Sequence, residues 1–386
     1  QTEGRKKTRS QYLRAERTKA QRLKDAVSTE RSEDLRILTR PAEKADRSRF
    51  SRGGFRRSFH THAMRATMQT FKKSRDRFSN RTFMSDVIAT VWDFDKTLIP
   101  GYMQDPIFKR FKVDAKSFWA ENEAEIKKLI DQKMDVNKDS YYLNRFIRLS
   151  QPGRASDGLN NQVLRELGAK LEFYPGAVEL FQEIQGLNSQ DPYREFGIKF
   201  ENYIVSTGFK KMIQGSQIAD HVKHIWGAEL IDVMGEDGKT RISEIAYSLD
   251  NTTKTRALFE INKGVGIVTG STIDVNTKIP NEQRRVQFCN MVYVADGPSD
   301  VPAFSVLKQK GGATMAVYPK GDEKAFREVD RLQREDRVDM IAEADYSKGS
   351  GAYLWLMTRL KDQAQQIIDR IKAPYAKAPG TPPHQV

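Results

Sequence analysis

The sequence has little of what marks several common classes of protein. Its 386 residues include one cysteine, Cys289, so no disulfide can form within the chain. It contains no run of about 18 apolar residues that would cross a membrane, and no charged start followed by an apolar stretch that would direct secretion. We therefore expect a cytoplasmic protein without a membrane partner, and interpret Cys289 as a small core residue.

Hydrophobic residues are scarce and unevenly distributed: they make up 38% of the chain, against roughly 45–50% in an average globular protein. Residues 1–80 hold 23 Lys and Arg and 9 Asp and Glu, whereas the remainder holds 42 of each and is neutral. Residues 1–83 are therefore predicted to be a basic, disordered arm. Two alternatives stay open: the arm binds nucleic acid, or it is not native, because Met84 precedes the first strand.

Beyond the arm, apolar runs alternate with helical patterns. Four short runs have the composition of buried parallel strands: residues 87–92, 202–206, 291–295 and 313–317. Helical spacing fills the stretch between the first two runs and predicts an inserted cap. We predict an α/β fold in three parts: a Rossmann-like parallel-sheet core of residues 84–105 and 174–365, an α-helical cap of residues 106–173, and a flexible tail of residues 366–386.

Acidic side chains follow two of these strands. Asp93 and Asp95 end the first, and because residues i and i+2 of an extended chain point the same way, both project from the carboxyl edge of the sheet. Asp296 and Asp300 follow the third strand on a turn rich in Gly, Pro and Ser. Adjacent carboxylates repel each other, and a divalent cation such as Mg²⁺ removes that conflict. Either acidic pair alone is also typical of a helix cap.

The second strand and a later helix add groups suited to an anion. Ser206, Thr207 and Gly208 form a strand-to-helix turn, where a hydroxyl and backbone N–H groups can hold a phosphate oxygen. Lys254, at the start of a predicted helix, can supply positive charge. Ser-Thr-Gly is also an ordinary turn, so these assignments depend on the acidic pairs. We place His221 and His224 on a helix surface rather than in a metal site.

These segments together resemble the four motifs of the haloacid dehalogenase superfamily. Asp93–Thr97 is similar to the first motif, Ser206 to the second, Lys254 to the third and Asp296–Asp300 to the fourth. The resemblance extends over residues 84–320, and the predicted cap is similar to the helical cap of the phosphoserine phosphatase branch.

The resemblance implies a Mg²⁺-dependent phosphomonoester hydrolase acting on a small phosphorylated metabolite. Asp93 would be the nucleophile that forms an aspartyl-phosphate, and Asp95 the general acid and base. Lys254 would neutralise negative charge. The residues implied to bind the phosphoryl group are Ser206, Thr207 and Gly208. The residues implied to hold Mg²⁺ are Asp93, Asp95 through its backbone carbonyl, Asp296 and Asp300.

Several points stay open at this stage. The acid at position 95 indicates phosphate chemistry, but a phosphotransferase of the same superfamily, or a nucleic-acid-associated protein that uses the arm, remains an alternative. Lys278 competes with Lys254 as the third-motif lysine. Residues 100–104 lack the substrate-reading Glu of phosphoserine phosphatases. The candidate substrate readers in the cap are Tyr142, Arg145 and Arg148. The oligomeric state is not predicted.

Overall fold

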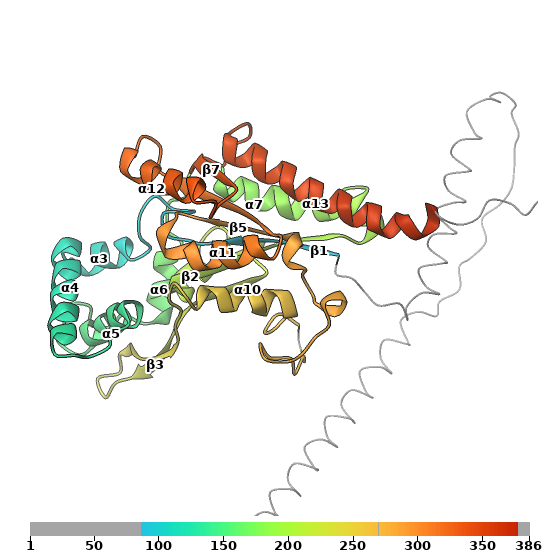
Figure 1. Cartoon of the computed structure of the whole chain (residues 1–386). Coiled ribbons are helices and arrows are strands. Elements are labelled where there is room, and N and C mark those ends of the chain that lie inside the picture. Colours follow the sequence, from blue (N-terminus) through green and yellow to red (C-terminus); the bar gives the residue numbers. More distant parts are fainter. Residues whose placement is uncertain (1–85, 269, 377–386) are drawn as a thin grey trace, which may run out of the picture. The chain divides into compact units, whose positions relative to one another are not determined.

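The computed structural model describes residues 86–268 and 270–376, with the backbone alone for 374–376 (Figure 1). The arm predicted for residues 1–83, with its proposed nucleic-acid contacts, lies outside this part of the chain.

A seven-stranded sheet forms the centre of the described residues (Figure 1). Its strands lie in the order β4-β3-β2-β1-β5-β6-β7, and every neighbouring pair is parallel except β3 and β4. The strands are β1 (Val87–Trp92), β2 (Lys199–Phe209), β3 (His224–Met234), β4 (Thr240–Tyr247), β5 (Met291–Ala295), β6 (Ala313–Tyr318) and β7 (Met340–Glu343). The predicted α/β fold with a Rossmann-like parallel sheet is confirmed.

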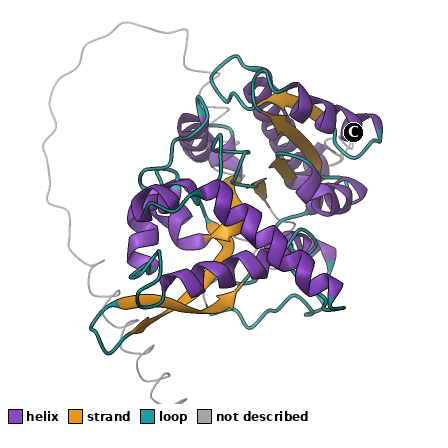
Figure 2. Cartoon of the chain, turned by 90° about the vertical axis from the view of Figure 1, so that its left-hand side faces the viewer, coloured by secondary structure: helices purple, strands orange, loops and turns teal. Residues whose placement is uncertain are grey.

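Helices cover both faces of the sheet (Figure 2). One face packs against α7 (Ala177–Gly186) and α13 (Gly351–Ala376). The other packs against α10 (Lys254–Lys263), α11 (Val301–Gln309) and α12 (Glu323–Arg334). Strands buried on both sides explain why the runs are apolar without alternation. The short connecting elements are α8 (Tyr193–Phe196), α9 (Lys210–Gly215), η1 (Leu187–Ser189), η2 (Ala219–His221), η3 (Asn281–Gln283), η4 (Phe288–Asn290) and η5 (Pro298–Asp300).

Four helices lie in the chain between β1 and α7, and we call them the α3–α6 segment. They are α3 (Asp105–Phe111), α4 (Ala115–Asp131), α5 (Lys138–Ser150) and α6 (Asn161–Gly168). Three of them begin with a capping side chain that accepts a hydrogen bond from the backbone N–H three residues later: Asp114, Asn137 and Asn160. The β3–β4 hairpin packs on this segment, since the Ile242 N–H donates to the Leu159 carbonyl at 2.9 Å.

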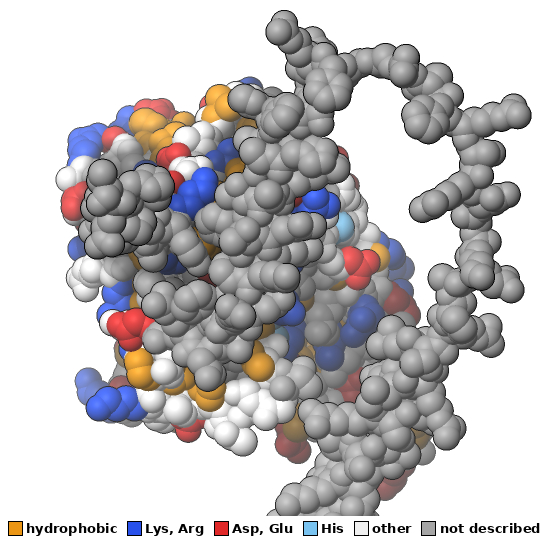
Figure 3. All heavy atoms as spheres, turned by 90° about the vertical axis from the view of Figure 1, so that its right-hand side faces the viewer, with side chains coloured by type: hydrophobic (Ala, Val, Ile, Leu, Met, Phe, Trp, Pro, Cys, Tyr) orange, Lys and Arg blue, Asp and Glu red, His pale blue; other side chains and the backbone are white. Residues whose placement is uncertain are grey.

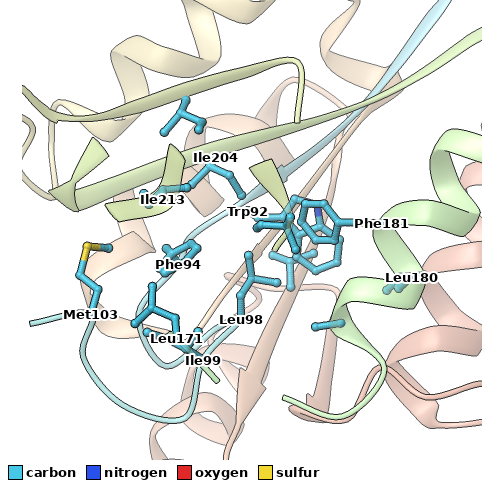
Figure 4. Close-up of a cluster of buried hydrophobic side chains, with 14 of the residues drawn as sticks. Trp92, Phe94, Leu98, Ile99, Met103, Leu171, Leu180, Phe181, Ile204 and Ile213 are labelled. Atoms are coloured by element: carbon cyan, nitrogen blue, oxygen red, sulfur yellow. The ribbon is translucent and has the colours of Figure 1, made fainter. Parts of the chain in front are cut away.

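An aromatic cluster fixes the end of β1 (Figure 4). The Trp92 ring packs against Phe181 of α7, with ring centroids 5.0 Å apart, and against Tyr346 at 5.6 Å. Its indole N–H donates to the Asn202 side chain at 3.2 Å, and the Tyr346 hydroxyl donates to the Thr97 carbonyl at 2.6 Å. The loop after β1 is therefore anchored to the face of the sheet that α7 covers.

Three predictions about local structure are wrong. The flexible tail does not begin at residue 366, because α13 continues to Ala376 and buries Ile367 and Ile368. The two histidines do not share a helix: His221 ends η2 and His224 begins β3, a strand rich in β-branched residues. Cys289 is exposed on η4 rather than buried in the core.

The surface of the described residues has a mixed character. Lysine, arginine, acidic and apolar side chains are interspersed on the face visible in Figure 3, as the balanced charge of the body predicts. None of the described helices combines the length and the apolar character needed to cross a membrane.

Candidate active site

The carboxyl ends of three adjacent strands meet at one point of the sheet. Trp92 of β1 pairs with Ile204 of β2 on one side and Val294 of β5 on the other. Asp93 therefore lies one residue beyond this row, and Ser206 and Asp296 lie two residues beyond it. The register alone brings the first, second and fourth sequence motifs to the same edge, as the sequence predicted from the direction of the strands.

Asp93 is buried at the centre of this edge. Its backbone N–H donates to the Val294 carbonyl at 2.9 Å, which fixes the residue in line with β5. Its Oδ1 accepts from Lys254 Nζ at 2.7 Å, and its Oδ2 accepts from the Thr97 hydroxyl at 3.1 Å. Burial raises the pKa of Asp93 to about 6, against the opposing effect of Lys254 and with a smaller contribution from Asp300. Asp93 is thus a carboxylate at neutral pH.

Asp95 lies beside it in a tight loop that Lys96 turns with a φ of 59°. The Asp95 carboxyl accepts a hydrogen bond from the Met103 N–H at 2.8 Å. Burial first, and the charge of Asp93 second, raise the pKa of Asp95 to about 8. The two carboxyl groups therefore differ in protonation at pH 7: Asp93 is ionised, and Asp95 carries a proton that it can donate.

Lys254 joins the site from the first turn of α10. Its ammonium lies between two carboxylates, 2.7 Å from Asp93 Oδ1 and 2.8 Å from Asp300 Oδ1. Burial alone would lower the pKa of Lys254, but Asp300 and Asp93 together raise it above its ordinary value, so the side chain stays charged. Asp300 is held in turn by the Tyr293 hydroxyl at 2.6 Å and the Ser299 hydroxyl at 2.7 Å. Asp300 therefore positions the ammonium against Asp93.

Asp296 completes a group of acids that can hold a metal ion. Carboxylate oxygens of Asp93, Asp296 and Asp300 all lie within 4.8 Å of one another. Burial first, and then Asp93 and Asp300, raise the pKa of Asp296 to about 7. Gly297 follows with a φ of 130°, a conformation that favours glycine and turns the chain back into α11. Three carboxylates this close together have the donor chemistry of a divalent-cation site.

The predicted phosphate-binding residues lie at the end of β2, which continues to Phe209 rather than stopping at Ser206. Pairing with β3 shifts register between Val205 and Phe209, and this irregular stretch holds Ser206, Thr207 and Gly208. The Ser206 hydroxyl accepts from the Gly208 N–H at 3.0 Å. A side chain at position 208 would meet the sulfur of Met103, because an ideal Cβ there lies 2.5 Å from it. The glycine thus lets this stretch approach the loop after β1.

The structure separates the other candidates. Lys278 is exposed, whereas Lys254 is buried among the acids, so Lys254 is the lysine of this site. Arg145 and Arg148 form ion pairs with glutamates of α4, while Tyr142 donates to the Thr207 carbonyl at 2.7 Å.

Sequence reasoning missed two residues of the site, Thr97 and Tyr293. The Thr97 hydroxyl contacts Asp93, and its place two residues after Asp95 was a signal for that role. Tyr293 sits inside an apolar strand, and the sequence carries no signal that its hydroxyl reaches Asp300.

Comparisons with known proteins give a sequence relative and several structural neighbours. No family model matches the chain. An uncharacterized protein of Borreliella burgdorferi is 38% identical over 290 residues, which cover 71% of this chain and 97% of that protein. Among solved structures, a HAD family hydrolase from Salmonella enterica serovar Typhi is 15% identical, covers 67% of each chain and has a TM-score of 0.40. A probable phosphoserine phosphatase from Vibrio cholerae is 17% identical, covers 74% of this chain and 69% of its own, and has a TM-score of 0.42.

Proposed function

We propose that this chain, which belongs to the same family as the Borreliella burgdorferi protein, is a Mg²⁺-dependent phosphomonoester hydrolase. Its sheet and its order of motifs are those of a haloacid dehalogenase superfamily hydrolase. The observation that carries the proposal is that two neighbouring acids differ in protonation state. Asp93 is ionised and held by Lys254, while Asp95 beside it is protonated at neutral pH. A nucleophile and a general acid side by side suit phosphoryl transfer.

The acids present fit a Mg²⁺ ion. Asp300 accepts three hydrogen bonds, from Lys254, Tyr293 and Ser299, so it orients the lysine, and Oδ2 keeps one acceptor position for the ion or one of its waters. Asp93 and Asp296 would hold the ion, together with the Asp95 backbone carbonyl. When bound, the ion would neutralise charge on the phosphoryl oxygens and the carboxylates.

The chain's own residues then divide the reaction into two steps. An Asp93 carboxylate oxygen attacks phosphorus, the bond from phosphorus to the alcohol oxygen breaks, and that oxygen takes the proton from Asp95. Asp95, now ionised, takes a proton from a water molecule whose oxygen attacks the phosphorus of the aspartyl-phosphate. This second step releases phosphate, frees the Asp93 carboxylate and returns the proton to Asp95. The ammonium of Lys254 and the hydroxyl of Ser206 stabilise the negative charge.

The activity of the enzyme is expected to depend on pH in a bell shape. Asp93 must be ionised to attack, so kcat/KM rises as pH increases through the pKa of Asp93, which is about 6 without metal and which bound Mg²⁺ would lower. Asp95 must be protonated to donate, so kcat/KM falls as pH increases through about 8. Initial rates between pH 4.5 and 9.5 measure both limbs as apparent values of the coupled pair. A rate that keeps rising to pH 9.5 would contradict the assignment of Asp95 as the acid.

The proposed activity is tested most directly by phosphate release from p-nitrophenyl phosphate and a panel of phosphorylated metabolites. We expect turnover with Mg²⁺, loss of turnover with EDTA, and recovery when Mg²⁺ is added back in excess. Ca²⁺ serves as the matched ion, because it takes more ligands at longer distances and fits an octahedral site poorly. Failure to release phosphate from every ester in the presence of Mg²⁺ would refute the proposal.

A further inference from the structure

The α3–α6 segment presents one helix face to the catalytic acids. On α5, Asp139 and Tyr142 are three residues apart and so lie on the same face. The Tyr142 hydroxyl donates to the Thr207 carbonyl at 2.7 Å. At the start of α5, Asn137 donates to Asp250 at 2.9 Å, and the Asp250 carbonyl accepts from the Lys254 N–H at 3.0 Å. This face is therefore tied both to the end of β2 and to the turn that carries the catalytic lysine.

Gln104 adds a buried acceptor beside Tyr142. It directly precedes α3, its side chain is only 3% exposed, and its Oε1 has no hydrogen-bond partner in the described part of the chain. Its side chain lies beside the Tyr142 hydroxyl. A phenol has one proton, and that of Tyr142 goes to the Thr207 carbonyl, so this hydroxyl cannot donate to Oε1 of Gln104. Its Oε1 is thus left as an acceptor without a donor, which is costly for a buried group.

Asp139 is a second free acceptor on this side of the site. Within residues 86–268 and 270–376, its carboxylate forms no hydrogen bond or ion pair, although the side chain is half-buried. The charges of Asp95 and Asp139 both contribute, after burial, to a raised pKa of Tyr142. The charge of Asp139 therefore reaches the Tyr142 hydroxyl, as the charge of Asp95 does.

The cations that would balance these acceptors are engaged elsewhere. All three basic side chains of α5 form ion pairs with glutamates of α4: Lys138 with Glu123, Arg145 with Glu121 and Glu125, and Arg148 with Glu125. Lys96, in the catalytic loop, has its ammonium over the Tyr102 ring, 4.4 Å from the centroid. Within the described residues, the α5 face thus offers acceptors and a negative charge to a substrate, while each basic side chain of α5 itself is ion-paired.

We propose that Gln104, Asp139 and Tyr142 form a leaving-group subsite for an alcohol that carries an amine and no carboxylate. The inference rests on the proposed function, because it concerns the alcohol that Asp95 protonates as the bond to phosphorus breaks. The ammonium group of the substrate would donate to Oε1 of Gln104 and to the carboxylate of Asp139. Such charge-assisted hydrogen bonds satisfy the acceptor that the folded chain leaves open.

A series of four phosphate esters that differ in one group tests this subsite. The probes are 2-aminoethyl, 2-hydroxyethyl, ethyl and carboxymethyl phosphate, and the readout is kcat/KM. We expect the amine to exceed the ethyl ester by about 10- to 100-fold, the range that one or two charge-assisted hydrogen bonds give. The carboxymethyl ester is expected to be the poorest of the four, because its carboxylate faces Asp139.

Variants then assign the preference to residues. Gln104→Leu and Asp139→Asn should each reduce the ratio of amine to ethyl ester by about 10-fold, and Gln104→Glu should increase it. Gln162→Leu, an exposed glutamine of α6, is the matched control and should keep the wild-type ratio. Equal kcat/KM for the amine and ethyl esters, or a preference that survives in both Gln104→Leu and Asp139→Asn, overturns the subsite but leaves the hydrolase intact. Absence of turnover with all four esters and with p-nitrophenyl phosphate overturns the proposed function as well.

Discussion

Asp93→Asn is expected to lower kcat for phosphate release by on the order of 10⁴-fold or more, the scale seen when a covalent nucleophile is removed. The amide of asparagine has no negative oxygen to attack phosphorus, so the first covalent step is lost. Steady-state phosphate release with Mg²⁺ at pH 7 measures the effect.

The fold of this variant should survive. Burial already disfavours the charge of Asp93, since its pKa is raised to about 6, and an amide of the same shape carries no charge to bury. Lys254 keeps Asp300 as its partner at 2.8 Å. We therefore expect the free energy of unfolding to change by only about 1 kcal/mol, the usual size for a substitution that leaves no buried charge unpaired.

A matched variant and a chemical trap separate the nucleophile from a general loss of charge. Asp362→Asn removes an exposed carboxylate from α13 and should leave kcat unchanged. Acid-quenched wild type, incubated with substrate, should yield a phosphorylated peptide that contains Asp93. Asp95→Asn should accumulate this peptide with p-nitrophenyl phosphate, whose phenolate leaves without a proton, because the water step lacks its base. If Asp93→Asn retains more than about one hundredth of the wild-type kcat, Asp93 is not the nucleophile.

The acidic part of the site could be predicted because it follows from local rules. An apolar strand followed by acids places those acids at the carboxyl edge of a parallel sheet, and the register of β1, β2 and β5 then brings Asp93, Ser206 and Asp296 together. Helical spacing in the sequence also favours Lys254 over Lys278 as the lysine of the site. Lys254 is in phase with the buried residues of α10, Ala257, Leu258 and Ile261, and so faces the sheet.

The substrate-facing part could not be predicted, because it depends on how distant elements pack. In the sequence, Gln104 is only a residue that precedes a helix. Its place beside Tyr142 depends on how α5 packs. In the sequence, Asp139 cannot be distinguished from a solvated acid. Its position depends on the hydrogen bond by which Asn137 connects the start of α5 to Asp250. Neither contact leaves a periodic pattern in the chain.

The missed elements of the fold have a similar cause. The β3–β4 hairpin contains Glu and Asp among its apolar residues, and it owes its place to pairing with β2 and packing on the α3–α6 segment. The end of α13 was underestimated because Lys361 and Asp362 interrupt its apolar pattern. Leu360, Ala364, Ile367 and Ile368 nevertheless continue the helical spacing and are buried.

Lys254→Met is expected to destabilise the protein by about 3–5 kcal/mol at pH 7.5 and to lower kcat by roughly 10²–10³-fold. The ammonium of Lys254 is the cation shared by two buried carboxylates, at 2.7 Å from Asp93 and 2.8 Å from Asp300. Methionine fills the space but leaves both acids without compensation. Urea unfolding without added metal measures the stability, and phosphate release measures kcat.

The pH dependence of this loss identifies its origin. Without the ammonium, the pKa of Asp93 in the folded protein rises further above its ordinary value of 3.8. A group with a raised folded pKa contributes stability below its unfolded pKa and loses it as pH rises through the folded pKa. Lys254→Met should therefore be least destabilised near pH 5 and increasingly so toward pH 7.5. Lys361→Met on the exposed face of α13 should show no such trend.

Lys254→Arg distinguishes charge from geometry. A guanidinium keeps the positive charge but is larger and planar, and the side chain of Lys254 is almost fully buried. We expect this variant to recover most of the stability at pH 7.5 while kcat remains at least about 10-fold below wild type, because the charge no longer sits between Asp93 and Asp300 at the same distance. A Lys254→Met variant that loses equal stability at pH 5 and pH 7.5 would mean that packing, rather than the uncompensated carboxylates, sets the cost.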